Sequence, residues 1–294
     1  MAQLIRTFIL VFFISALLLG CSSNQVNEDL TTAIPKESSE KLQEKPANTY
    51  LNETENTDAV DEHLDSSKVE QSNTEQSGTT NQKIKYYVNR NYFIKPVNPD
   101  DPNKVVLLTF DDTPRGENTV RILNILDKYQ AKAIFFINGH YAVKNKELVK
   151  EIYNRGHIIG NHAWWHENLN YLNEEDTKNE IIKVSDLVEE ITGERPKYFR
   201  PPNGALAKNP YAKEILANEQ MQRMNWSLGS RDWEIVKPEL AEKVVEEIKN
   251  NVISGSNILM HDIEITANAL DKILAFLVEE GYTFVLPTEV IIEN

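Results

Sequence analysis

Five short polar motifs, each at or near the end of an apolar run, contain the residues of this chain that could do chemistry. They are Thr109-Phe110-Asp111-Asp112, His162-Ala163-Trp164-Trp165-His166, Arg200-Pro201-Pro202, Asp232-Trp233 and Leu259-Met260-His261-Asp262. Two adjacent carboxylates, two histidines four residues apart, an arginine and a third histidine are the groups from which hydrolytic metal sites are built. The order and spread of the motifs predict one active site, assembled from the ends of several strands.

The histidine pair supplies the first candidate metal ligands. A spacing of four would place His162 and His166 on one face of a helical turn, where one cation can contact both imidazoles. Residue 163 is Ala, so the Glu of the zinc-protease motif H-E-x-x-H is absent. Asp111 or Asp112 could be the third ligand, and two His with one carboxylate leave positions open for water and substrate. We expect a catalytic metal site, and the alternative is a pair of surface or capping histidines.

The adjacent aspartates should have different roles, because neighbouring side chains of a strand point to opposite sides of the sheet. One of Asp111 and Asp112 could bind the metal, while the other takes a proton from water that the ion has made more acidic. Asp112, Thr113 and Pro114 also suit a turn that caps a helix, and the two interpretations are compatible.

The first residues are typical of an export signal. Arg6 is followed by an apolar stretch of thirteen residues, Thr7 to Leu19, which is short for a membrane span. Cys21, the only cysteine, comes directly after Leu18-Leu19-Gly20. This segment resembles the lipobox of bacterial lipoproteins, which implies a signal peptide over residues 1–20 and a lipid on Cys21. The protein would then be exported and anchored to the outer face of the cell membrane. The alternatives are an ordinary cleaved signal, or an uncleaved anchor, with an incidental Cys.

A polar, acidic segment follows. Residues 22–82 contain thirteen Asp and Glu against four Lys, so they carry −9 of the net charge of −14. Such a composition buries too little apolar surface to offset the entropy of ordering. We expect residues 21–85 to be a disordered tether, followed by a catalytic domain over residues 86–294. The scarcity of clustered Lys and Arg argues against nucleic acid as a partner.

The rest of the chain is long enough for one large domain, which we expect to be a monomer. Several of its apolar runs are apolar on both faces, as the strands of a covered parallel sheet are. The runs are 105–110, 133–137, 157–160, 198–199, 224–228, 258–260 and 282–286. Helical spacing is clearest at Ile181, Val184, Val188 and Ile191, and at Ala267, Leu270, Leu274 and Leu277. This alternation predicts an α/β fold, a distorted (β/α) barrel of about seven parallel strands.

Taken in order, the five motifs resemble those of the polysaccharide deacetylases, the carbohydrate esterase family 4 with the NodB-homology domain. The resemblance covers about residues 100–290. It implies hydrolytic removal of acetate from N-acetylated sugars in polymers such as peptidoglycan or chitin. It makes Asp111 the general base, and Asp112, His162 and His166 the ligands of one divalent metal ion. Zinc is the metal we expect, with cobalt, nickel, manganese and iron as alternatives.

The same resemblance assigns the other catalytic roles. Arg200 would hold and orient Asp111. His261 would act as the general acid on the leaving amine, and Asp232 would tune that acid. These assignments are chemically consistent, because amide hydrolysis needs an activated water, stabilisation of the oxyanion and a proton for the departing nitrogen.

Several residues would shape the substrate pocket. The resemblance places Trp233 and Leu259 in it. Trp164 and Trp165 could stack on sugar faces, or they could belong to the core. Asn203 stands where the family often has an aromatic residue after Arg-Pro-Pro, so it would alter the wall of the groove.

Two further departures from the family pattern, Thr113 for Gly and Ala163 for Ser or Thr, remove no catalytic group. The sequence leaves N-acetylglucosamine, N-acetylmuramic acid and a glycan outside the wall open as substrates. It also leaves other functions open. These are a weak or inactive cell-wall-binding lipoprotein, a deacetylase of chitin-like oligomers, and a metal-dependent isomerase or esterase on a similar barrel.

Overall fold

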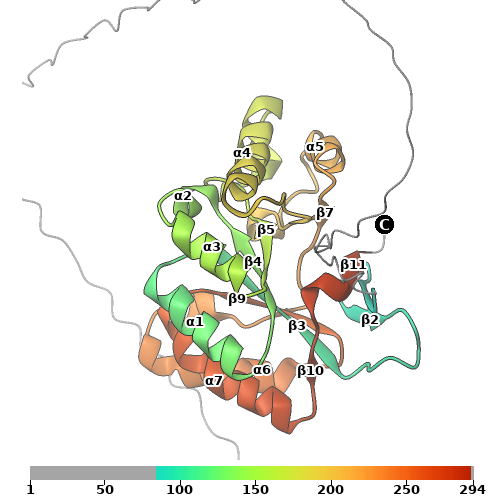
Figure 1. Cartoon of the computed structure of the whole chain (residues 1–294), viewed down its shortest axis with the longest axis vertical. Coiled ribbons are helices and arrows are strands. Elements are labelled where there is room, and N and C mark those ends of the chain that lie inside the picture. The colour runs from blue at the N-terminus through green and yellow to red at the C-terminus, as the bar shows by residue number, and fades with distance from the viewer. Residues whose placement is uncertain (1–83, 293–294) are drawn as a thin grey trace, which may run out of the picture. The chain divides into compact units, whose positions relative to one another are not determined.

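The computed structural model describes residues 84–292. The expected signal peptide, Cys21 and nearly all of the expected tether lie outside these residues. Within them, parallel strands form a curled sheet that helices cover from outside (Figure 1). In spatial order the strands are β7 (Gln222–Arg223), β6 (Tyr198–Phe199), β5 (Ile158–Asn161), β4 (Ala133–Ile137), β3 (Val105–Thr113), β9 (Ser256–His261) and β8 (Leu228–Gly229).

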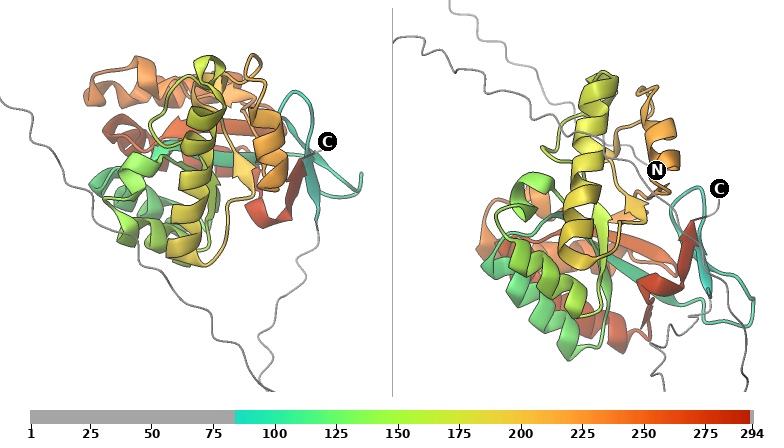
Figure 2. Two further views of the ribbon diagram at one scale, coloured as in Figure 1. Left: turned by 90° about the horizontal axis from the view of Figure 1, so that it is seen from above. Right: turned by 45° about the horizontal axis from the view of Figure 1, so that its top comes forward.

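Helices connect these strands and pack on the outer face of the sheet, as the two further views show (Figure 2). The longer ones are α1 (Glu117–Lys128), α3 (Lys146–Asn154), α4 (Glu174–Thr192), α6 (Ala241–Asn251) and α7 (Glu264–Glu279). The short helices are α2 (Gly139–Ala142) and α5 (Ala212–Asn218), and five single turns of 3₁₀ helix are Leu169–Tyr171, Pro202–Gly204, Asp232–Glu234, Pro238–Leu240 and Pro287–Glu289. Every pairing between neighbouring strands of the large sheet is parallel.

The two faces of β3 pack against different partners. Val106, Leu108 and Phe110 belong to the main core, together with apolar residues of α1, α3, α6 and α7. Val105 and Leu107 face a second core, which includes residues of β1 (Tyr86–Val88), β2 (Ile94–Pro96) and β11 (Val290–Ile292). These three strands form a small separate sheet in the order β11-β1-β2. Thr109 and Asp111, which continue the face of Val105 and Leu107 toward the C-terminal end of β3, are polar. The candidate catalytic residues of β3 therefore lie only at this end of the strand.

The helix expected around residues 181–191 is confirmed as α4, with clear boundary signals. The Asn173 side chain accepts a hydrogen bond from the backbone N–H of Asp176 at its start, and Gly193 ends it in the left-handed conformation (φ 83°). Its buried face includes Ile181, Val184 and Val188. The other expected helix is confirmed as α7.

The predicted fold class, an α/β barrel of about seven parallel strands, is confirmed, but one predicted strand is wrong. The run 224–228 is not a single strand, because β7 ends at Arg223 and β8 begins at Leu228. Between them the carbonyl groups of Met224 and Asn225 accept hydrogen bonds from Arg200. Among the described residues no pairing joins β7 to β8, so the barrel is open there. The run 282–286 contributes β10 (Thr283–Phe284), which pairs only with the first residues of β3.

No helix between residues 84 and 292 is both long enough and apolar enough to cross a membrane.

Candidate active site

A bulge at the end of β3 brings both aspartates to one place. Asp111 continues the inward-facing side of the strand and is 3% exposed. Asp112 has a left-handed backbone (φ 59°), and the pairing with β4 shifts register between Phe110 and Thr113. His162 Nε2 therefore lies 3.6 Å from Asp111 Oδ2 and 3.7 Å from Asp112 Oδ1. The expectation that the adjacent carboxylates diverge is wrong, because the bulge breaks the two-residue period of the strand.

The two histidines lie in the loop after β5, and not on the helical turn that their spacing suggested. Ala163 and His166 each have φ of 64°, which a regular α-helix does not allow. The imidazoles of His162 and His166 nevertheless lie together, with ring centroids 5.0 Å apart. His162 Nδ1 donates to the carbonyl oxygen of Arg200 at 2.7 Å, so the lone pair of Nε2 faces the two aspartates.

Two buried polar side chains hold this loop. Asn161 Oδ1 accepts from the backbone N–H of Ala163 at 2.9 Å. Glu180 of α4 accepts from the backbone N–H groups of Trp164 and Trp165 at 3.0 and 2.9 Å. Burial raises the pKa of Glu180, although these two hydrogen bonds oppose the rise. The curve of the loop between the histidines is thus set by a strand end and by a helix.

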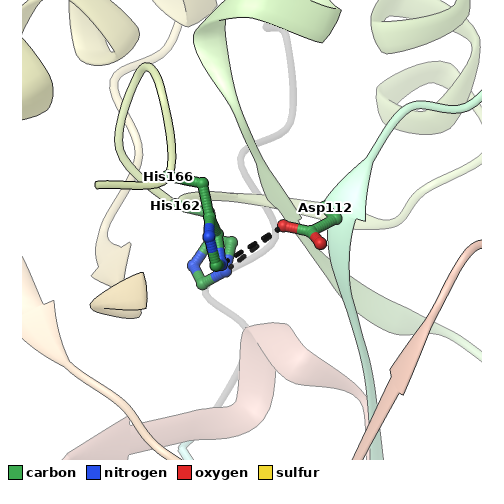
Figure 3. Close-up of side chains that lie close together, drawn as sticks. All are labelled: Asp112, His162 and His166. Atoms are coloured by element: carbon green, nitrogen blue, oxygen red, sulfur yellow. Dashed lines mark ion pairs between the residues drawn. The ribbon is translucent and has the colours of Figure 1, made fainter. Parts of the chain in front are cut away.

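Asp112, His162 and His166 converge on one point (Figure 3). Asp112 Oδ1 is 3.7 Å from His162 Nε2 and 3.5 Å from His166 Nε2, and all three candidate ligand atoms lie within 4.8 Å of one another. This Oδ1 is buried and has no hydrogen-bond partner among the described residues. A carboxylate oxygen without a donor, placed between two imidazole nitrogens, suits a divalent cation. The three side chains therefore fit a catalytic metal site.

The directions of the pKa shifts of Asp112 and His162 agree with that fit. Burial alone would raise the pKa of Asp112, but the charges of His162, His166, His261 and Arg115 outweigh it and lower the pKa. Burial lowers the pKa of His162, against the opposing effect of the aspartates. An ionised carboxylate and a neutral imidazole are the forms that bind metals.

Arg200 is fully buried and holds Asp111. Its Nη1 donates to Asp111 Oδ1 at 2.7 Å and to Thr109 Oγ1 at 2.8 Å. The guanidinium lies over the ring of Phe136, 4.1 Å from the centroid. Burial lowers the pKa of Arg200, but the ion pair with Asp111 opposes this. One oxygen of Asp111 is thus fixed by Arg200, while Oδ2 faces His162.

His261 and Asp232 form a second coupled pair. His261 Nδ1 donates to Asp232 Oδ1 at 2.9 Å, and the backbone N–H of His261 donates to Oδ2 at 2.7 Å. The Thr266 hydroxyl donates to the same Oδ2 at 2.5 Å. Burial would lower the pKa of His261, but the hydrogen bond and charge of Asp232, helped by Asp111 and Asp112, raise it. The imidazole is therefore prepared to carry a proton.

The predicted pocket residues differ in how closely the structure joins them to this site. The Trp233 ring lies edge-on to His261, 5.5 Å between centroids, and is 44% exposed. Leu259 lies on β9 and is 3% exposed. Asn203 is exposed and has φ of 56°, a conformation that Asn tolerates better than most residues. No contact joins Asn203 to the catalytic groups in the described part of the chain.

The adjacent residues Trp164 and Trp165 differ in burial. Trp164 is partly buried against the main core, and its ring lies so close to Gly139 that a Cβ there would collide with it. Trp165 is 62% exposed, and its ring is stacked on that of His140 at 5.4 Å and 21°. Of the two alternatives, Trp164 is a core residue and Trp165 is available to a ligand.

Two residues near the site were given no role from the sequence. Arg115 donates to the carboxylate of Asp112 at 2.9 Å. Asp262 is fully buried, and burial raises its pKa to about 7. A signal existed for each, since Arg115 is three residues after Asp112 and Asp262 follows His261 directly, but both residue types are usually solvated.

The arrangement can perform hydrolysis. It combines a metal triad, a carboxylate held by an arginine, and a histidine whose pKa a second carboxylate raises. A base, a Lewis-acid site and an acid around one point are the groups that amide or ester hydrolysis requires.

Comparison with known proteins points the same way. The sequence profile of the polysaccharide deacetylase family matches residues 98–224. The chain is 36% identical over 185 residues to the peptidoglycan-N-acetylglucosamine deacetylase of Bacillus cereus, covering 61% of this chain and 66% of the relative. It is 34% identical over 187 residues to the peptidoglycan-N-acetylmuramic acid deacetylase PdaC of Bacillus subtilis, covering 63% of this chain and 38% of that protein. The match thus covers about two thirds of the first of these relatives and 38% of the second.

Solved structures show the same likeness. The Bc1960 peptidoglycan N-acetylglucosamine deacetylase, in complex with 4-naphthalen-1-yl-N-oxidanyl-benzamide, is 36% identical with a TM-score of 0.59, covering 64% of this chain and 90% of that one. BA3943 of Bacillus anthracis, a pseudoenzyme of carbohydrate esterase family 4, is 27% identical with a TM-score of 0.57, covering 66% of this chain and 65% of that one.

Proposed function

This chain belongs to the polysaccharide deacetylase family, and from that premise we propose that it removes N-acetyl groups from the amino sugars of peptidoglycan, using one divalent metal ion. The observation that carries the proposal is the buried, unpartnered Oδ1 of Asp112 between His162 and His166. Zinc is the metal we propose, because two imidazoles and one carboxylate suit it.

The residues divide the reaction between them. A divalent cation held by Asp112, His162 and His166 would polarise the acetyl carbonyl and make a water molecule more acidic. Asp111, fixed through Oδ1 by Arg200, would take the proton from the attacking water. His261, protonated with the help of Asp232, would donate a proton to the leaving nitrogen. The products are acetate and a free amine on the sugar.

Acetate release tests this proposal. The purified chain is incubated with wall glycan and, in parallel, with chitin oligomers, before and after metal removal by a chelator. We expect acetate and free amine from the wall glycan, loss of activity without metal, and recovery when zinc is restored. An isomerase would release no acetate, and activity on chitin oligomers alone would replace peptidoglycan as the substrate.

The sugar that loses its acetyl group is a separate part of the proposal. The relatives act on different residues by name, N-acetylglucosamine in one and N-acetylmuramic acid in the other. We propose N-acetylglucosamine, the residue named for the first of these relatives. Mass spectrometry of muramidase fragments from treated glycan would locate each free amine, and an amine on muramic acid would contradict this choice.

A second candidate function has one observation in its favour. The likeness to the pseudoenzyme BA3943 allows that this chain binds wall glycan with little or no catalysis. Against it, the chain retains Asp111, Asp112, His261 and Arg200, held by specific contacts. Binding of wall glycan without any acetate release in the presence of zinc would support this function instead.

We also propose that the protein is a lipoprotein anchored to the outer face of the cell membrane through Cys21, with residues 22–82 as a tether. Support comes from the apolar stretch before Leu18-Leu19-Gly20-Cys21 and from the acidic, polar composition that follows. Labelling with a fatty-acid analogue should mark the protein, and Cys21→Ala should abolish the label. Deleting residues 22–82 should leave the melting temperature and the turnover of soluble oligosaccharide unchanged, while reducing access to intact wall. A large fall in melting temperature would contradict the tether.

A further inference from the structure

Arg115 contacts a metal ligand directly, although the proposed reaction gives it no role. Its Nη2 donates to Asp112 Oδ2 at 2.9 Å, and its Nε donates to the backbone carbonyl of Asp112 at 3.0 Å. The other oxygen of the same carboxylate, Oδ1, faces His162 and His166 at 3.7 and 3.5 Å. The two oxygens of Asp112 therefore have separate partners.

The guanidinium is itself held in place. Asp262 is fully buried and accepts from the backbone N–H of Arg115 at 2.8 Å and from the Thr119 hydroxyl. Asp262 Oδ1 lies 3.8 Å from Arg115 Nε. The guanidinium also lies over the Tyr141 ring, 4.9 Å from its centroid. Asp112, Asp262 and Tyr141 thus contact an arginine side chain that is 32% exposed.

We propose that Arg115 is a positioning residue of the metal site: it binds Oδ2 of Asp112 so that Oδ1 alone is presented to the cation, and Asp262 and Tyr141 hold it there. The inference rests on the metal site of the proposed function. Groups that hydrogen-bond a metal-ligating side chain commonly change metal affinity by about 10–100-fold when they are removed.

Arg115 has two opposing effects on a bound cation. The two N–H groups that Arg115 directs at Asp112, referred to as its fork, orient the carboxylate and so strengthen metal binding. The positive charge of Arg115 repels the cation and so weakens metal binding. Two substitutions separate them. Arg115→Gln removes both the charge and the fork, whereas Arg115→Lys keeps the charge and loses the two-point geometry. If orientation dominates, both substitutions weaken metal binding. If charge dominates, Arg115→Gln binds metal more tightly than wild type.

The experiment measures metal binding apart from activity. Metal-free protein is titrated with zinc in competition with a chromophoric chelator, and cobalt is added separately to record the visible absorption of the site. We expect Arg115→Gln to bind zinc about tenfold more weakly or worse, Arg115→Lys to bind it more weakly still because the repelling charge remains, and both to alter the cobalt spectrum.

The control is Arg121→Gln. Arg121 lies on α1 and donates to Asn268 at 2.6 Å and to Asn118 at 3.5 Å, neither of which is a metal ligand. This variant should match wild type in both measurements. Melting curves of the metal-free proteins check folding, and Arg115→Lys keeps the test informative if Arg115→Gln does not fold.

The outcomes separate the inference from the function on which it rests. Unchanged or tighter zinc binding in Arg115→Gln overturns the positioning role. Unchanged zinc binding with a raised KM would instead make Arg115 a substrate-binding residue. If wild-type protein itself binds no zinc or other divalent cation, the proposed function fails, and not only the role of Arg115.

Discussion

The proposed proton transfers depend on two carboxylates with different partners. Asp111 is paired with a fully buried arginine, and Asp232 is paired with an imidazole and a hydroxyl. The types of these residues could be predicted from the sequence, because a hydrolase needs a base and an acid. Residue spacing alone could not predict their partners, since Arg200 is 89 residues from Asp111 and Asp232 is 29 from His261; only the resemblance to the family implied these two pairings. Arg115 and Asp262 were given no role for a related reason: nothing in the sequence shows that Arg115 meets the carboxylate of Asp112 or that Asp262 is buried.

Replacing the base should abolish turnover without loss of metal. Asp111 lies next to the triad, yet the unpartnered oxygen belongs to Asp112. Asp111→Asn keeps the shape and should lower kcat about 10²–10⁴-fold, as removal of a general base does. Zinc content, measured by atomic emission, should stay at one ion per chain. Near-normal turnover would show that another group is the base, and lost zinc would make Asp111 a ligand.

Removing the partner of the general acid should change the pH profile. Asp232 raises the pKa of His261, so the protonated acid persists to higher pH. Activity needs this proton, and the alkaline limb of kcat therefore follows the pKa of His261. Asp232→Asn removes the charge, lowers that pKa and should move the alkaline limb to lower pH, while the acid limb stays. A profile measured with saturating zinc tests this, and an unmoved alkaline limb would remove His261 from the role of acid.

Two local irregularities explain how the elements assemble the site. The bulge of β3 turns Asp112 toward Asp111, and the loop after β5 brings His166 back to His162 through two residues with positive φ. Regular strand and helix periods predicted the wrong geometry at both places. The side chains still meet because Asn161, at the end of β5, and Glu180, on α4, hold the backbone of the loop by hydrogen bonds. Periodicity can predict elements, but the departures that build a site depend on tertiary contacts.

The two tryptophans in the loop between His162 and His166 should differ in effect: one substitution should change glycan binding and the other should change stability. Trp165 is exposed and stacked on His140, so Trp165→Ala should raise the KM for polymeric glycan about 2–10-fold, with little change in melting temperature. Trp164 packs on the core, so Trp164→Ala should lower the free energy of unfolding by up to about 3 kcal/mol. Steady-state kinetics and denaturant melts on the matched pair test this. The same loss of stability in both variants would contradict the division.

The whole molecule carries a buried histidine that should make its stability fall in acid. His157 is 1% exposed, and its Nδ1 accepts from the backbone N–H of Ala133 at 3.2 Å. Its Nε2 has no hydrogen-bond partner among residues 84–292. Burial, with help from the charge of Lys132, lowers the pKa of His157 to about 3. The folded protein therefore keeps this imidazole neutral, whereas the unfolded chain protonates it near its ordinary value.

The sign of the effect follows from these two values. Above about pH 6.5 neither state binds the proton, and His157 adds no pH dependence. Between about 6.5 and 3 only the unfolded state binds it, so the free energy of unfolding should fall by about 1.4 kcal/mol per pH unit. In His157→Gln the new side chain can still accept from the backbone N–H of Ala133 but cannot titrate. As the pH is lowered, the free energy of unfolding of this variant should therefore fall less steeply than that of wild type, by about 1.4 kcal/mol per pH unit. Urea melts from pH 7 to pH 5 on both proteins measure the difference in slope, in which the other titrating groups cancel. Equal slopes would mean that the folded protein protonates His157 as readily as the unfolded chain does.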